Sequence, residues 1–194
     1  ITTGTGADVI SSGAGADTVN AGNGNNTITG GADADSLTGG ANNDLFFYGG
    51  GEFVTAETVT GGGGVNTVEF TADTQTVGDA NFANKTDINQ ITFANGANDL
   101  TLGVTAAGAT ASLTVNSGTG ADTINAGSLG EALTVNAGNG ANSVIGSSLA
   151  DSITTGTGAD VISSGAGADT VNAGNGNNTI TGGADADSLT GGAN

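Results

Sequence analysis

Apolar residues recur every nine positions near both ends of the chain. In the N-terminal part these positions are Ile10, Val19, Ile28, Leu37 and Phe46, and in the C-terminal part they are Val144, Ile153, Ile162, Val171, Ile180 and Leu189. The residues around them alternate with period two and are often β-branched, as in "TVN" and "TIT", which predicts short strands with the central side chain inward. Glycine recurs between the strands and favours tight turns with positive φ.

One strand and one turn in nine residues make half a coil, so eighteen residues are expected to make a full coil. Such coils stack at about 4.8 Å through parallel ladder hydrogen bonds. The predicted fold is therefore all-β, a parallel β-roll or β-solenoid. Its interior holds about one aliphatic side chain per nonapeptide. Because burying each contributes only about 1.5–3 kcal/mol, against an ordering cost of about 1–2 kcal/mol per residue, the roll is expected to be disordered without bound ions.

An acid or amide stands two positions before each apolar residue, which gives the pattern GGxGxDxUx. Residues eighteen apart should stack on one edge, so Asp151, Asp169 and Asp187 form an all-Asp column, whereas Asn142, Asp160 and Asn178 alternate. Two carboxylates about 5 Å apart repel by roughly 1–3 kcal/mol. A calcium ion between them, which takes 6–8 oxygen ligands, turns this repulsion into a net attraction.

The predicted calcium ligands are the acids and amides at this motif position: Asp8, Asp17, Asn26, Asp35, Asp44, Asp122, Asp151, Asp160, Asp169, Asn178 and Asp187. The all-Asp edge is expected to bind calcium more tightly than the alternating edge, because Asn is a neutral and weaker ligand. The competing interpretation is that Asp and Asn serve only as turn formers.

The nonapeptide resembles the RTX calcium-binding repeat of exported bacterial proteins. The resemblance covers about residues 3–47 and 117–194, in consecutive copies of one register. It implies a parallel β-roll with two nonapeptides per turn and calcium between the loops. It also implies an extracellular or cell-surface location, reached through type I secretion.

Three regions are expected: RTX rolls at 1–47 and 117–194, and a less regular β segment at 48–116. The middle contains strand-like runs such as "NTVEFTA", "INQITFA" and "DLTLGVTA" and most of the aromatic residues, but no useful helical period. It is interpreted as a wider solenoid section with a fuller core, and a separate β-sandwich is the alternative. "DANFANKTDINQITF" is a candidate short helical or loop excursion. The segment also looks like the spacers of S-layer-like proteins and adhesins.

Residues 1–42 and 153–194 are identical, at an offset of 152. This duplication indicates a window onto a longer tandem array, such as a fibre, an adhesin stalk or a surface layer, in which units continue or self-associate. If the whole unit were regular solenoid, 152 residues would span roughly 40 Å.

Composition narrows the function. The formal net charge is −18, with Lys85 as the single basic residue, which argues against nucleic-acid and anionic-membrane partners. The chain has no His or Cys that could act in catalysis. Asp at every ninth residue forms a regular array rather than an active site, so the protein is not expected to be an enzyme. No apolar run is long enough to span a bilayer.

The predicted function is a calcium-stabilised extracellular structural repeat, and a calcium-triggered folding module for secretion is the alternative. Ice binding is a third possibility, which some similar β-rolls carry out through rows of Thr and Asn. The residue between the loop glycines varies here, so no uniform row of this kind is expected.

Overall fold

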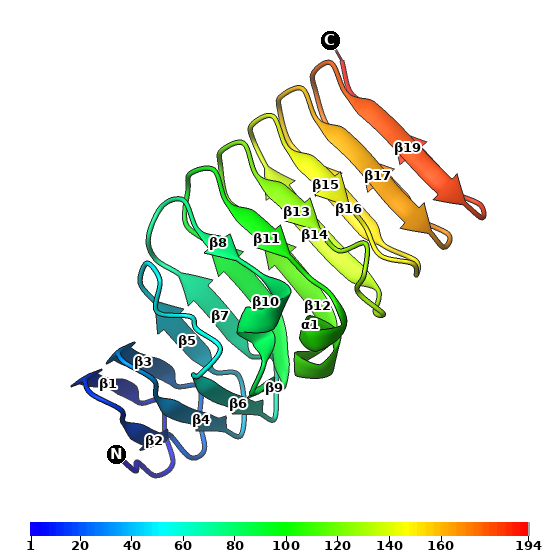
Figure 1. Cartoon of the computed structure of the whole chain (residues 1–194). Coiled ribbons are helices and arrows are strands. Elements are labelled where there is room, and N and C mark those ends of the chain that lie inside the picture. The colour runs from blue at the N-terminus through cyan, green and yellow to red at the C-terminus, as the bar shows by residue number, and fades with distance from the viewer. Residues whose placement is uncertain (194) are drawn as a thin grey trace.

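Short strands alternate with loops along the whole chain, and each strand pairs in parallel with the strand one coil away. The computed structural model describes residues 1–193. It shows a stack of coils with the two termini at opposite ends (Figure 1). The predicted parallel β-roll is confirmed.

Three sheets form the two faces of the stack. The ten-stranded sheet runs through β1 (Val9–Ala14), β3 (Thr27–Ala32), β5 (Leu45–Tyr48), β7 (Thr67–Phe70), β10 (Ile88–Phe93), β12 (Thr110–Asn116), β14 (Leu133–Gly138), β16 (Ser152–Thr155), β18 (Thr170–Asn172) and β20 (Ser188–Thr190). The four-stranded sheet consists of β2 (Thr18–Asn20), β4 (Ser36–Gly40), β6 (Thr58–Gly62) and β9 (Lys85–Thr86). The six-stranded sheet consists of β8 (Thr76–Val77), β11 (Asp99–Thr101), β13 (Thr123–Asn125), β15 (Ser143–Ile145), β17 (Val161–Ala166) and β19 (Thr179–Ala184).

The strand register confirms two nonapeptides per coil in the repetitive blocks. Ile10 pairs with Ile28, and Ile162 pairs with Ile180, each a step of eighteen residues. The coils of the middle are longer, as the pairing of Leu45 with Thr67 and of Val59 with Lys85 shows. The additional residues lie in the loops, so the strands stay stacked.

The apolar positions of the nonapeptide form the core, as predicted. Val19, Ile28 and Ile153 are at most 1% exposed. Leu189 departs from the pattern at 45% exposure, because it lies in the last coil of the stack. One aliphatic column per face therefore fills the interior of the repetitive blocks.

The middle segment continues the solenoid, because β5, β7, β10 and β12 lie in the same sheet as the strands before and after them. Its core is fuller, as expected. Phe53 packs edge-on against Tyr48, Phe70 and Phe82, with ring centroids 5.0–5.4 Å apart. Phe70 stacks on Phe93 at 4.9 Å. The domain boundaries at residues 47 and 117 stay a prediction.

Two short helices protrude from the middle coils, η1 (Asp79–Phe82) and α1 (Val104–Ala109), and they contact each other (Figure 1). The first lies within the expected excursion. The second was not predicted, and the strand expected through "DLTLGVTA" was wrong after Thr101. The reason is a tertiary cap: the Asp79 carboxylate accepts hydrogen bonds from the backbone N–H groups of Gly103 and Ala106, both at 2.8 Å.

Equivalent strands of the two identical 42-residue segments lie on opposite faces of the stack. "VISSGA" forms β1 of the ten-stranded sheet in the first copy and β17 of the six-stranded sheet in the second. Successive pairings lead from Val9 through seven coils to Ser152. Val161, the equivalent of Val9, follows nine residues later, which is half a coil. A shift of 152 residues therefore corresponds to seven and a half coils.

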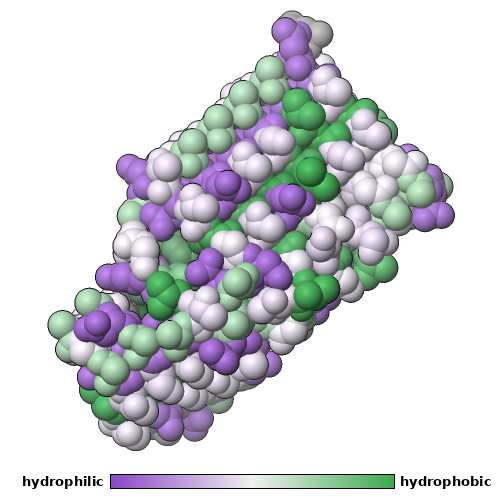
Figure 2. Space-filling view, viewed as in Figure 1, coloured by the Kyte–Doolittle hydropathy of each residue, from purple (hydrophilic) through white to green (hydrophobic). Residues whose placement is uncertain are grey.

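The visible surface is mixed in character, and Figure 2 shows green apolar side chains in a diagonal band between white and purple residues. Val161 on β17 is 54% exposed and Ile145 on β15 is 41% exposed. Within residues 1–193, no helix has the length and apolar character needed to cross a membrane.

Candidate metal sites

The acids and amides of the motif form columns along the edges of the stack, as predicted. In the regular coils of the repetitive blocks, the backbone N–H of a column residue donates to a side-chain oxygen of the residue eighteen positions later. Asp151 N–H donates to Asp169 Oδ1 at 2.8 Å, and Asn142 N–H donates to Asp160 Oδ1 at 2.9 Å. In the N-terminal block, Asp17 N–H donates to Asp35 Oδ1 at 2.8 Å. One oxygen of each such carboxylate is thereby used to bind the neighbouring coil.

The columns continue through the middle segment, where sequence spacing did not reveal them. Asp35 N–H donates to Glu57 Oε2 at 3.3 Å, and Asp44 N–H donates to Asn66 Oδ1 at 3.0 Å. Asn98 N–H donates to Asp122 Oδ1 at 2.8 Å. Longer loops hide these residues from an eighteen-residue period. Asn66 had a detectable signal, because it occupies the acid position of the nonapeptide "GGGGVNTVE".

Five carboxylates of the columns keep one buried oxygen without any hydrogen-bond partner in the described chain. These atoms are the Oδ2 oxygens of Asp17, Asp35, Asp44, Asp160 and Asp169. Asp160 and Asp169 are at most 1% exposed. A buried carboxylate oxygen without a donor is costly, and a bound cation removes that cost.

Burial also affects the acidity of these groups. It raises the pKa of Asp44, although hydrogen bonds to Asn26 partly counteract the rise. A carboxyl whose pKa is raised by burial is one whose charged form lacks stabilisation, which a divalent cation would supply.

Glycines leave space for several of the column carboxylates. A Cβ atom at Gly30 would overlap Asp35 Oδ2, one at Gly39 would overlap Asp44 Oδ2, and one at Gly182 would overlap Asp187 Oδ2. Each of these glycines stands five residues before its Asp, at the start of the motif. Only glycine lets the carboxylate turn into its own loop, where backbone carbonyls are the other candidate oxygen ligands.

Among residues 1–193, no three His, Cys, Asp or Glu side chains gather into one cluster. A cation at these loops would thus be held by one or two carboxylates together with loop carbonyls. Calcium accepts such mixed sets of oxygen ligands, whereas magnesium demands near-ideal octahedral geometry. The residues present therefore fit calcium.

The other predicted ligands lie in the columns but have different surroundings. Asp8 and Asp187 are partly exposed in the first and last coils. Asp122 Oδ2 accepts a hydrogen bond from the Ser117 hydroxyl at 2.8 Å, and Asp151 Oδ2 accepts one from Ser147 N–H at 2.6 Å. These two carboxylates have protein donors on both oxygens.

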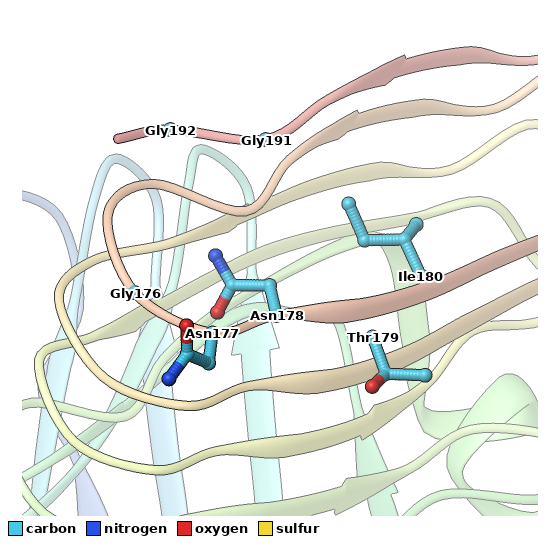
Figure 3. Close-up of a pocket in the computed structure, with 7 residues that line it drawn as sticks. All are labelled: Gly176, Asn177, Asn178, Thr179, Ile180, Gly191 and Gly192. Carbon is cyan, nitrogen blue, oxygen red and sulfur yellow. The ribbon is translucent and has the colours of Figure 1, made fainter. Parts of the chain in front are cut away.

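Asn26 and Asn178 direct their amide groups into their own loops. Asn26 Nδ2 donates to Gly24 O at 3.1 Å, and Asn178 Nδ2 donates to Ala173 O at 2.9 Å. Asn178 borders a hollow of about 450 Å³ at the end of the stack, lined also by Gly176, Asn177, Thr179, Ile180, Gly191 and Gly192 (Figure 3).

Lys85 is an internal cation that sequence reasoning did not place. It stands above Val59 in the core column, and its Nζ donates to the backbone carbonyls of Val54, Glu57 and Ala83. The ammonium lies 4.9 Å from the centroid of the Phe53 ring. Burial lowers the pKa of Lys85 to about 8, and the Glu57 carboxylate partly offsets this. The Lys85 ammonium group thus binds loop carbonyls at the end of the four-stranded sheet that β9 forms.

Comparison with protein families identifies the repeats. Residues 1–28, 20–52, 136–171, 145–180 and 164–194 match the RTX calcium-binding nonapeptide repeat (four copies), and together they span more than half of the chain. Comparison with curated proteins and with solved structures found no significant match. The stacked coils, the columns of acids and the matched repeats lead to one conclusion: this chain belongs to the RTX calcium-binding nonapeptide repeat family, and calcium is the ion it binds.

Proposed function

We propose that the chain is a calcium-stabilised structural repeat of an extracellular bacterial surface or matrix protein. The observation that carries the proposal is the way the second 42-residue copy joins the stack. Thr134 pairs with Ser152 and Ser143 pairs with Val161, so the copy continues both faces of the solenoid. A sequence that repeats every 152 residues can therefore extend one rod.

The half-coil offset gives such a rod a definite appearance. Each unit adds seven and a half coils, or about 36 Å at 4.8 Å per coil. This is shorter than the 40 Å expected from the sequence, because the middle coils contain more than eighteen residues. Each unit is rotated by half a coil relative to the unit before it, so the protruding helices η1 and α1 lie on alternate sides of the rod. The full repeat is two units, or about 72 Å.

The calcium ligands within this proposal are the Asp residues of the columns, foremost those with an unpartnered oxygen. No catalytic role is assigned to them, because they form a lattice along two edges. Assembly through tandem continuation or self-association, and export by type I secretion, belong to the same proposal. RTX repeats are typical of secreted proteins, which supports the extracellular location.

Electron microscopy of a concatemer of the 152-residue unit tests the proposal. In calcium we expect straight rods that lengthen by about 36 Å per unit, with protrusions alternating between sides. After chelation the rods should lose their order. Compact beads on flexible linkers in calcium would contradict the structural role and would favour a folding module for secretion.

Ice binding is a second candidate, favoured by one exposed row of side chains. Asn95, Thr119, Asn139, Thr157 and Asn175 follow one another along a loop edge. Thr119 Oγ1 donates to Asn95 Oδ1 at 2.8 Å, and Thr157 Oγ1 donates to Asn139 Oδ1 at 3.0 Å. The row is not uniform, as expected, but each member is Thr or Asn. Sequence analysis missed it because successive loops alternate between the two edges.

Thermal hysteresis of the calcium-loaded chain tests this second function. If the row binds ice, a freezing gap and shaped ice crystals should appear, and Thr157→Lys within the row should abolish both. Lysine disrupts the spacing of the row and adds a strongly hydrated charge. Absence of a freezing gap in the unaltered chain would dismiss ice binding.

A further inference from the structure

The column position is Asp in some loops and Asn in others, and the two residues satisfy their loops differently. At Asn98 the amide nitrogen donates to the carbonyls of Ala94, Gly96 and Ser117 at 3.0–3.2 Å. At Asn142 it donates to the carbonyls of Gly138 and Gly140, both at 3.2 Å. In these loops, a side-chain donor already occupies the space among the carbonyl oxygens.

An Asp in the same place reproduces only half of this arrangement. Its Oδ1 accepts a hydrogen bond from a backbone N–H group of the preceding coil. The Asn side-chain oxygen does the same, since Asp160 N–H donates to Asn178 Oδ1 at 2.9 Å. Its Oδ2 occupies the position of the Asn amide nitrogen. This oxygen can only accept hydrogen bonds, and the loop carbonyls around it are also acceptors, so no donor is left for it. This explains why Asp160 and Asp169 retain buried, unpartnered Oδ2 atoms. Asp122 and Asp151 escape this outcome because Ser117 and Ser147 supply donors.

We propose that the chain combines two kinds of loop, Asp loops closed by calcium and amide loops closed by the Asn side chain in place of the ion. The inference rests on the proposed calcium binding of the Asp loops. The amide loops are those of Asn26, Asn66, Asn98, Asn142 and Asn178. Asn26 and Asn178, which the sequence predicted as ligands, therefore have a structural role that needs no ion. The number of calcium ions follows the number of Asp loops without a protein donor.

The opposite substitutions Asn142→Asp and Asp160→Asn in the full chain test this inference, since they exchange nearly isosteric side chains in one column. Two quantities are measured: calcium ions bound per chain at saturation, by titration calorimetry, and the melting temperature at a fixed, limiting calcium concentration that just keeps the stack folded. Asn142→Asp should add one ion per chain at saturation and lower the melting temperature at limiting calcium by about 2–4 °C, because two carbonyls lose their donor and the new site is largely unfilled. Asp160→Asn should remove one ion and raise that temperature by a similar amount.

Asn125→Asp is the matched control, because Asn125 is an exposed residue of β13 outside the columns. It adds the same charge and should leave the stoichiometry unchanged. The inference is overturned if Asn142→Asp leaves both quantities unchanged, or if Asp160→Asn lowers the melting temperature at limiting calcium. If the unaltered chain binds no calcium, the proposed function fails, but its folding then needs no ion and the melting temperatures of the two variants still test the amide loops.

Discussion

Removal of calcium is expected to unfold the RTX blocks at both ends of the chain while the coils between them keep their hydrogen-bonded strands. The end blocks have a thin core, and all five unpartnered buried oxygens lie there, in ranges matched by the family. Each site filled at a hundredfold excess of calcium over Kd contributes about 2.7 kcal/mol to folding. Without that contribution, one aliphatic residue per nonapeptide does not offset the loss of chain entropy.

The middle coils have other sources of stability. Phe53 and Phe70 belong to a buried aromatic cluster, and such rings contribute beyond their buried area. The side chains of Asn66 and Asn98 donate hydrogen bonds to carbonyls of their own loops, and the Lys85 ammonium group also donates to loop carbonyls. The Asp side chains of the columns offer no such donor. The aromatic, amide and ammonium groups of the middle coils do not depend on a dissolved ion.

Hydrogen exchange in calcium and in chelator would measure the difference segment by segment. Amides of β1 to β4 and of β16 to β20 should lose protection in chelator, whereas those of β7, β10 and β12 should keep it. Magnesium at the same concentration is the control and should not restore protection, because it rarely accepts a flexible set of carbonyl ligands. Equal protection of all strands in chelator would contradict the prediction.

A single methyl group at Gly165 should destabilise the stack by about 2–5 kcal/mol. Gly165 has φ +110°, which costs an L-residue about 1–2 kcal/mol. A Cβ atom there would also overlap the carbonyl oxygen of Ser147 in the coil below, and such overpacking typically costs about 1–3 kcal/mol. Urea unfolding of Gly165→Ala in saturating calcium, followed by circular dichroism, measures the sum.

The duplication provides a control of identical local sequence. Gly13 is the equivalent of Gly165 in the first copy and has nearly the same φ, +105°, but no atom lies within 4 Å of its Cβ position. Gly13→Ala should therefore cost only the backbone strain, about 1–2 kcal/mol. Equal losses for the two variants would show that close stacking of the coils is not what requires glycine at this position.

Much of the site could be predicted from spacing alone. An eighteen-residue period places Asp169 above Asp151 whatever else the fold contains, because parallel strands in a regular coil keep their register. The same spacing could not tell which carboxylates lack a donor. Asp151 and Asp169 have the same motif position, but Ser147 happens to satisfy only the first.

The sequence by itself determined the local rules of this protein: the length of the strands, the inward apolar residue, the glycine turns and the choice of calcium. These follow from short-range sterics and from the chemistry of repeated carboxylates. The tertiary structure decided how many coils the chain makes, and hence that Val9 and Val161 lie on opposite faces. It also decided that α1 forms under the Asp79 cap and that Lys85 enters the core. The physical reason is that loops absorb additional residues without shifting the strands, so distance along the sequence does not count coils, whereas strand pairing does.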